Sequence, residues 1–249
     1  MRDVILPGLF VATIAAALIV PGGAARADDP GDKVLGLVDA AMNRAQTQYF
    51  EYEAVNAAPG KGDTTVGLTV RIKGDKRLTQ FTAPADMKGT KVLVLSPTET
   101  YVYLPAFGKV RRIASSVGDQ GFMGMTYSQD DFVTAYAPQY TAAVASQDDK
   151  QVKLVLTPKP GKTPPYAKIE ITASKDKYQA SELRYFNAEG KNVKTEIRTG
   201  YSCQGDVCAP AEQTMTDNTK NQSTKLARKV WKVNEAMSDD LFSKRALEK

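Results

Sequence analysis

Histidine is absent from this 249-residue chain, which holds two cysteines and a single tryptophan. Without histidine the chain has neither a Ser-His-Asp nor a Cys-His catalytic arrangement, and it lacks the most common zinc ligand. The sequence also contains no Gly-x-Ser-x-Gly turn and no phosphate-binding loop. We therefore expect a protein that is not an enzyme and that uses no metal ion and no cofactor.

Clusters of like charge are also missing. The formal net charge of +5 is spread along the chain, so no basic stripe predicts a nucleic-acid partner. Adjacent carboxylates such as Asp130 and Asp131 point in different directions on a strand or a helix. They fit the first turn of a helix better than a pair that shares a proton.

The one long apolar run lies at the start of the chain. Val4–Val20 follows the basic Arg2, and Pro21–Gly23 and the small-residue site Ala25–Ala27 come after it. This order is typical of a secretory signal peptide. A permanent membrane anchor is the alternative, but the run is close to the minimum spanning length and ends in helix breakers. We predict a signal peptide at residues 1–27, cut after Ala27, and one mature domain at residues 28–249.

The two cysteines lie close together, and export would place them in an oxidising compartment. Cys203 and Cys208 flank Gly205 and Asp206, which suit a turn. An even count at this spacing predicts a disulfide that closes the tip of a hairpin. A redox pair or half of a metal site is the alternative, but the spacing is not Cys-x-x-Cys and no further ligands exist.

Apolar periodicity separates one helix from a long series of strands. Residues 32–48 carry apolar side chains at helical spacing, which predicts an amphipathic helix. Period-two alternation and turn residues then predict about ten or eleven short strands that form one large antiparallel sheet. Twelve segments are candidates for these strands: 49–56, 64–72, 77–82, 91–95, 100–104, 109–113, 151–157, 167–173, 180–186, 194–201, 212–218 and 223–233. Residues 128–132 resemble a capped helix start, and residues 238–247 a short terminal helix or turn.

A sheet of this size must bury its apolar face against something. A closed barrel, a sandwich and a half-barrel capped by helices are the three options. A half-barrel under a movable cover would leave a cavity that a lipid tail can fill.

The segment 81–132 carries a resemblance to a known family. It contains Phe81 and Pro84, then Lys-Gly-Thr at 88–90, Tyr-Leu-Pro at 103–105, Arg-Arg-Ile at 111–113, Phe-Met-Gly at 122–124 and Ser-x-x-Asp at 128–131. In this order and spacing the motifs resemble those of the LolA-like outer-membrane lipoprotein-sorting protein family, as a divergent branch. The end of the chain, from Val233 to Leu247, is similar to that family as well.

The resemblance implies a mainly β fold, a large twisted half-barrel with an N-terminal amphipathic helix and short lid helices. It implies a periplasmic carrier that binds acyl chains of a lipoprotein or lipid in a hydrophobic cavity and moves it between envelope membranes. An inner-membrane transporter of the ABC or RND type and an outer-membrane acceptor are the implied partners. The alternative is an RseB-like periplasmic sensor or adaptor that binds lipid or lipoprotein and regulates a membrane partner.

Candidate residues for the cavity and its lid come mostly from the segment with the resemblance. Methionine and phenylalanine in loops that contain glycine suit a lid that repacks around a flexible chain, and they suit an ordinary core equally well. The candidates are Met87, Leu93, Leu95, Tyr101, Tyr103, Phe107, Phe122, Met123, Met125 and Phe132. Arg111 and Arg112 face opposite ways on a strand, so one of them is a candidate for a lipid headgroup, although both also suit a solvated surface.

Overall fold

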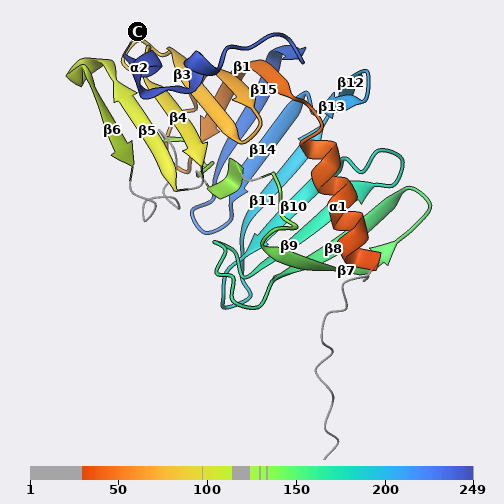
Figure 1. The fold of residues 1–249 in the computed structure, drawn as a ribbon. Coiled ribbons are helices and arrows are strands. Elements are labelled where there is room, and N and C mark those ends of the chain that lie inside the picture. Colours follow the sequence, from red (N-terminus) through yellow and green to blue (C-terminus); the bar gives the residue numbers. More distant parts are fainter. Residues whose placement is uncertain (1–29, 97, 114–123, 129, 133, 249) are drawn as a thin grey trace, which may run out of the picture.

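The computed structural model describes residues 30–96, 98–113, 124–128, 130–132 and 134–248 (Figure 1). The predicted signal peptide, residues 1–27, lies outside these ranges. The helices are α1 (Pro30–Met42), η1 (Pro105–Phe107), η4 (Asp130–Phe132), η5 (Asp239–Phe242) and α2 (Lys244–Leu247). The strands are β1 (Thr47–Ala57), β2 (Thr64–Lys73), β3 (Lys76–Ala83), β4 (Lys91–Ser96), β5 (Glu99–Leu104), β6 (Lys109–Ile113), β7 (Tyr140–Gln147), β8 (Gln151–Pro158), β9 (Lys168–Ser174), β10 (Ala180–Phe186), β11 (Asn192–Thr199), β12 (Ser202–Gln204), β13 (Val207–Ala209), β14 (Glu212–Asp217) and β15 (Gln222–Val233).

Thirteen of the strands form one antiparallel sheet in the order β6-β5-β4-β3-β2-β1-β15-β14-β11-β10-β9-β8-β7. The first six strands run outward from the middle to one edge, and the chain then starts again at the other edge and returns to the middle. The sheet is large and is not closed into a barrel. The predicted fold class, a mainly β protein with an open antiparallel sheet and an N-terminal helix, is confirmed.

The middle of the sheet is the long pairing of β1 with β15. It runs from Gln48 opposite Val233 to Ala57 opposite Ser223, with a bulge between Glu51 and Tyr52. A bulge bends its strand and increases the local twist. The two halves of the chain meet at this pairing. Because of the bulge, we expect the sheet to bend there.

Helix α1 crosses one face of the second half of the sheet (Figure 1). Leu35 and Val38 are its fully buried apolar residues. Gly31 lies directly against the backbone of Ala142 in β7, where a β-carbon would collide with the Ala142 carbonyl. The Asp32 carboxylate accepts a 2.6 Å hydrogen bond from the backbone N–H of Ala142. The start of the helix is thus fixed to the edge strand β7.

The predicted helix at residues 32–48 is too long at its C-terminal end. The structure ends α1 at Met42 and begins β1 at Thr47. Gln48 pairs with Ile72 on one side and with Val233 on the other. Two ladders of sheet hydrogen bonds outweigh the weak helical preference of this segment.

The strand count was also underestimated. Strand β7 was not predicted because its sequence, YTAAVASQ, has few large apolar residues to alternate. The short pair β12 and β13 forms a separate two-stranded sheet. Both elements border the second half of the molecule, where α1 packs.

Two apolar clusters fill the interior. The larger one lies between the sheet, α1 and the segment around η4, and it includes Phe50, Leu68 and Leu226. The smaller one consists of Leu78, Leu93 and Tyr101 together with Phe242 and Leu247 from the chain end. The C-terminal segment thus acts as a cover for β3, β4 and β5.

Candidate functional site

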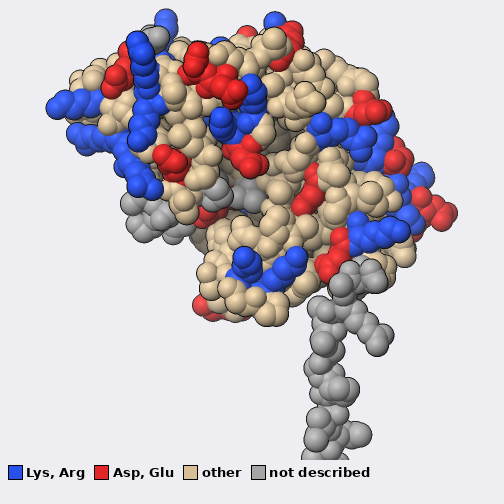
Figure 2. All heavy atoms as spheres, in the orientation of Figure 1, with Lys and Arg blue, Asp and Glu red and all other residues tan. Residues whose placement is uncertain are grey.

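The larger cluster is not completely filled, and a partly open cavity of about 160 Å³ lies within it. An engineered cavity of about 150 Å³ in another protein holds one benzene molecule. The cavity therefore has room for a short apolar group without any movement of its walls. Figure 2 shows this face of the molecule with a recess near its centre and charged side chains around it.

The floor of the cavity comes from neighbouring strands whose inward positions alternate. Strand β1 contributes Phe50 and Tyr52, and β2 contributes Leu68, Val70 and Ile72. The ring centres of Phe50 and Tyr52 are 5.2 Å apart in a stacked arrangement. Because every second residue of a strand faces the same side, the pattern of β2 produces a continuous apolar floor.

The cover of the cavity consists of the end of α1 and the residues around η4. Met42, Met125, Phe132 and Thr134 line the cavity from this side. Asn43 fastens the two parts together, since its amide nitrogen donates to the Thr134 carbonyl at 2.8 Å and its amide oxygen accepts from the Thr134 hydroxyl at 2.7 Å. These bonds are exposed to solvent, so water can replace them at little cost.

A second contact between helix and cover is made by Asp39. One carboxylate oxygen accepts a 2.8 Å hydrogen bond from the Ala137 backbone N–H, and the other is buried without a partner among the described residues. Desolvation raises the pKa of Asp39, against the lowering effect of its backbone hydrogen bonds. The ionised carboxylate of Asp39 is therefore destabilised, because one of its buried oxygens accepts no hydrogen bond from the described residues.

The side chain of Asp131 attaches the cover to the rest of the protein. Its carboxylate is fully buried and accepts hydrogen bonds from the Ser128 backbone N–H at 2.7 Å and the Ser128 hydroxyl at 2.8 Å. The Tyr166 hydroxyl donates to it at 2.5 Å, and the Lys194 ammonium lies 2.6 Å away. The predicted capping pattern at residues 128–132 is present here as a short 3-10 helix.

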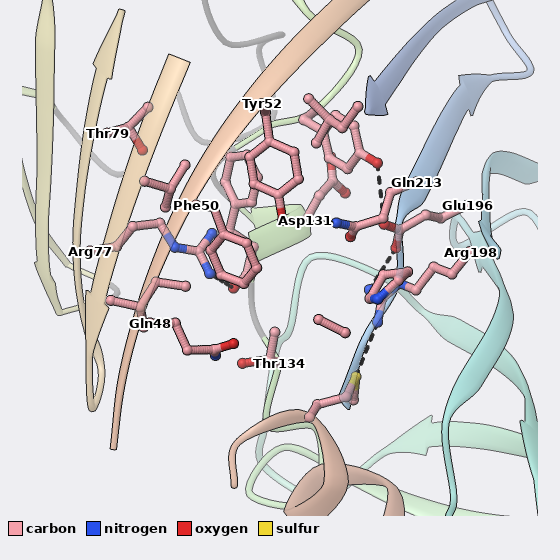
Figure 3. A pocket seen from close by; sticks show the side chains of 18 of the residues that line it. Gln48, Phe50, Tyr52, Arg77, Thr79, Asp131, Thr134, Glu196, Arg198 and Gln213 are labelled. Atoms are coloured by element: carbon pink, nitrogen blue, oxygen red, sulfur yellow. Dashed lines mark hydrogen bonds and ion pairs between the residues drawn. The ribbon is translucent and has the colours of Figure 1, made fainter. Parts of the chain in front are cut away.

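A buried ion pair stands at the opposite end of the cavity from Arg77 (Figure 3). The Arg198 guanidinium lies 2.8 Å from the Glu196 carboxylate, and the Tyr127 hydroxyl donates to the same carboxylate at 3.2 Å. Burial opposes the charge on Arg198, but Glu196 holds the pKa of that guanidinium above its ordinary value. Glu196 thus serves as the counter-ion of the buried Arg198 guanidinium.

Arg77 is the remaining charged side chain in the lining. Its guanidinium carbon lies 4.7 Å from the centre of the Phe132 ring, and one nitrogen is 3.4 Å from the Phe132 carbonyl oxygen. Figure 3 shows the guanidinium among the aromatic side chains of the cavity. Burial lowers the pKa of Arg77 to about 10, so the group remains a cation at neutral pH.

The predicted disulfide is confirmed. Cys203 and Cys208 are bonded and are directly paired in the hairpin of β12 and β13. Cys208 and the neighbouring Ala209 line the cavity. The disulfide thus stabilises a hairpin that forms part of the cavity rim.

Two of the predicted cavity or lid residues, Met125 and Phe132, line this cavity. Met87 is partly buried against the larger cluster without reaching the lining. Phe122 and Met123 lie outside the described residues. The structure therefore brings the predicted candidates together only at the cover.

Leu93, Leu95, Tyr101 and Tyr103 lie elsewhere. Leu93 and Tyr101 are buried in the smaller cluster, and Leu95 and Tyr103 pack beside them. Alternation along β3 gives the physical reason, because Leu78 pairs with Leu93 and faces away from the cavity side of Arg77 and Thr79. These four residues belong to, or pack against, the cluster that the C-terminal segment covers, and none of them lines the cavity.

The remaining candidates lie at the edge of the sheet. Phe107 is 60% exposed, and the Arg111 guanidinium lies 5.4 Å from its ring centre. Arg112 donates a 3.0 Å hydrogen bond to the Thr98 carbonyl. Both arginines are exposed, within a group of basic side chains over β5 and β6 (Figure 2). Neither of them reaches the cavity.

The sequence-based list lacks most of the lining. Phe50, Tyr52 and the inward residues of β2 were seen as strand residues, but alternation alone does not tell which face is inward. Arg77, Glu196 and Arg198 are not among the predicted site residues, because a charged residue in a strand is normally assigned to the surface. The predicted turn at Gly74-Asp75 does offer one signal for Arg77. It places Arg77 opposite Ile72, and residues that are directly opposite on neighbouring strands share one face of the sheet.

Comparison with protein families gives one match. A family model described as an uncharacterized protein matches residues 73–249, which is most of the chain. No curated protein matches the sequence significantly. The matched range includes β3, the cover around η4 and the whole second half of the sheet.

Solved structures with a similar fold span nearly the whole chain. A domain from Vibrio parahaemolyticus, titled as an outer membrane lipoprotein-sorting protein domain, is 22% identical with a TM-score of 0.79, and the match covers 88% of this chain and 98% of that one. A DUF1329 family protein from Desulfovibrio piger is 22% identical with a TM-score of 0.80, covering 88% and 99%. A LolA superfamily protein from Nitrosomonas europaea is 16% identical with a TM-score of 0.70, covering 87% and 98%.

Proposed function

Because the chain belongs to the family whose model matches residues 73–249 and has the LolA-like fold that its motifs predicted, we propose that it is a periplasmic acyl-chain carrier. In this proposal the protein binds the acyl chains of a lipoprotein or lipid and moves them between envelope membranes. The mature protein begins after Ala27. A related protein is titled as a lipoprotein-sorting domain, and this supports the general class of cargo.

The observation that carries the proposal is the partly open, mainly apolar cavity between the sheet and its cover. Phe50, Leu68, Val70 and Leu226 present aliphatic and aromatic surface to it. A buried methylene contributes about 0.8 kcal/mol of transfer free energy. Several carbons of an acyl chain would therefore supply useful affinity without any polar recognition.

A full acyl chain is larger than the present cavity of about 160 Å³, so binding requires the cover to move. The cover is suited to this movement, because Met125 and Phe132 are adaptable apolar residues and the bonds of Asn43 to Thr134 are exposed. Asp131 and Lys194 would keep one end of the cover in place. We infer that loading displaces the residues around Thr134 while η4 stays attached.

Displacement of a fluorescent fatty acid from the purified mature protein tests the proposal. The variant Val70→Trp should fill the floor of the cavity and weaken fatty-acid binding at least tenfold. Thr69→Trp is the matched control, since it adds the same side chain at the neighbouring position on the opposite face of β2. Equal binding by the two variants, or no binding by the wild type, would contradict an acyl-chain site in this cavity.

A second measurement separates a carrier from a sensor. The lipid-loaded protein is mixed with empty acceptor vesicles, and the transfer of labelled lipid is followed with time. A carrier releases its cargo to the vesicles and leaves it chemically intact. A protein that keeps the lipid but then binds a membrane-anchored regulator would instead be a sensor.

A further inference from the structure

Both carboxylates in the lining of the cavity, Asp131 and Glu196, are already paired with cations other than Arg77. Glu196 is paired with Arg198 at 2.8 Å, and Asp131 is paired with Lys194 at 2.6 Å. Among the described residues, no carboxylate oxygen lies within 4 Å of the Arg77 guanidinium. Neither carboxylate of the lining is therefore available as a counter-ion for Arg77.

The contacts that Arg77 does make are weak. The hydrogen bond from Arg77 to the Phe132 carbonyl is long, at 3.4 Å. The other contact is a cation–π interaction with the Phe132 ring, which is weaker than an ion pair with a carboxylate. Arg77 is partly buried, and a cation that is partly withdrawn from water without an anionic partner is costly to a folded protein. Its retention in an apolar cavity is understandable if a bound molecule supplies the missing negative charge.

The geometry suits such a molecule. Arg77 occupies one end of the cavity, and the apolar floor of Phe50, Leu68 and Val70 continues from it. Gln48 and Thr79, two uncharged polar side chains, line the cavity as well. A guanidinium presents a planar set of donors that matches a carboxylate or a phosphate.

We propose that Arg77 binds the anionic group of an amphiphile whose acyl chain lies on the floor of the cavity. The inference rests on the proposed function and deepens it, because it makes the ligand negatively charged and sets its orientation. The anionic group is a carboxylate or a phosphate. A free fatty acid would supply the first and a lipid headgroup the second.

Three ligands of equal chain length test the proposal: dodecanoate, dodecyl phosphate and the uncharged dodecanol. Each is titrated below its micelle concentration in competition with a fluorescent probe. The wild type should bind at least one anionic ligand about 10- to 100-fold more tightly than dodecanol, the range expected for hydrogen bonds to a charged group. A preference for dodecanoate indicates a fatty acid, and a preference for dodecyl phosphate indicates a lipid headgroup.

The variant Arg77→Met should reduce that preference to about twofold or less, while its affinity for dodecanol stays near the wild-type value and shows that the cavity is intact. Arg77→Lys should keep part of the preference, because an ammonium is a point charge without the planar fork. Lys76→Met is the matched control, since Lys76 is a partly exposed cation of the same strand that lies outside the cavity lining and pairs with Asp239 at 3.3 Å. This control should keep the full preference.

Two results would overturn the role of Arg77. One is equal binding of charged and uncharged ligands by the wild type, and the other is an unchanged preference in Arg77→Met. In both cases the acyl-chain site itself would stand. Failure of all three ligands to bind would remove the proposed function together with the inference, so the two failures are distinguishable.

Discussion

The two sides of strand β3 (Lys76–Ala83) face interiors of different kinds. On one side, Leu78 belongs to the smaller cluster, which Phe242 and Leu247 of the C-terminal segment close. On the other side, Arg77 and Thr79 face a cavity that the residues around η4 only partly fill. Both interiors are apolar and covered by a short segment, so the presence of a cover does not explain the difference between them.

The difference lies in how each cover is attached and what it inserts. The C-terminal segment places two buried apolar side chains directly into its cluster. The cover around η4 also buries Met125 and Tyr127, but polar contacts hold it as well, above all those of the buried carboxylate of Asp131. Attachment through polar groups fixes the position of a segment without requiring it to fill the space beneath. A sheet can therefore carry a sealed core on one face and a partly open cavity on the other.

The largest expected effect comes from breaking the polar attachment on the cavity side. Asp131→Ala leaves the Lys194 ammonium buried without its partner and should lower the free energy of unfolding by about 3–5 kcal/mol. Urea unfolding followed by tryptophan fluorescence measures the change. The double variant with Lys194→Met should regain part of the loss, and a double variant as unstable as the single one would refute the ion pair as the cause.

The next prediction compares a truncation on each side. Leu93 is fully buried in the sealed cluster, and Leu93→Ala should cost about 2–5 kcal/mol of unfolding free energy because it leaves a void. Ile72 is only partly buried and faces the cavity, so Ile72→Ala should cost at least 1 kcal/mol less, as a rough estimate from the smaller buried area.

Fatty-acid affinity should respond in the opposite way. Ile72→Ala changes the cavity and should alter affinity severalfold, whereas Leu93→Ala should leave affinity near the wild-type value. Equal effects of the two variants on affinity would show that the two interiors are coupled. Stability and affinity are measured on the same preparations.

A third prediction concerns the rim of the cavity. Replacing Cys203 and Cys208 together by serine should lower the free energy of unfolding by about 2 kcal/mol, the amount expected for a very short disulfide loop. The hairpin of β12 and β13 borders the cavity, so hydrogen exchange should increase there and stay unchanged around Leu93. Reduction of the wild type with dithiothreitol should reproduce the result.

The smallest expected effect concerns Asp39 and its dependence on pH. The pKa of Asp39 in the folded protein is raised, so the folded state binds its proton more tightly than the unfolded state does. Its contribution to stability therefore falls as the pH rises from the ordinary carboxyl pKa through the folded value. Asp39→Asn should remove this contribution and change stability at pH 7 by less than about 1 kcal/mol. Thermal unfolding between pH 4 and pH 7 gives the comparison, and a steeper pH dependence in the variant would contradict it.

Sequence patterns were sufficient for most of the fold. Alternation in segments such as Val66 to Ile72 identified strands because their buried face is regular, and the spacing of Cys203 and Cys208 identified the disulfide. Strand β7 was missed because its residues are small. The end of α1 was misplaced because pairing with β2 and β15 determines where β1 begins.

The cavity was harder to predict than the fold. Tyr101 and Tyr103 were candidates for the cavity, yet the face that a strand presents to a cavity depends on which segment covers it. The cover of β5 comes from the far end of the chain, and no local pattern indicates this. Arg77 illustrates the same limit, since its position opposite Ile72 suggests the cavity face, but its contact with Phe132 is visible only in the structure.

The pairing of β1 with β15 has a consequence for how the chain folds. The two strands lie near opposite ends of the sequence, and the hydrogen bond from the Gln46 backbone N–H to the Asn234 side chain joins residues 188 positions apart. Such a contact requires closure of a very long loop, and proteins dominated by distant pairings fold slowly, in milliseconds to seconds. Each half of the sheet is a meander of neighbouring strands that needs only local contacts. We expect the two meanders to form first and to join at this seam in the slow step, so a chain lacking β15 should collapse without reaching the native state.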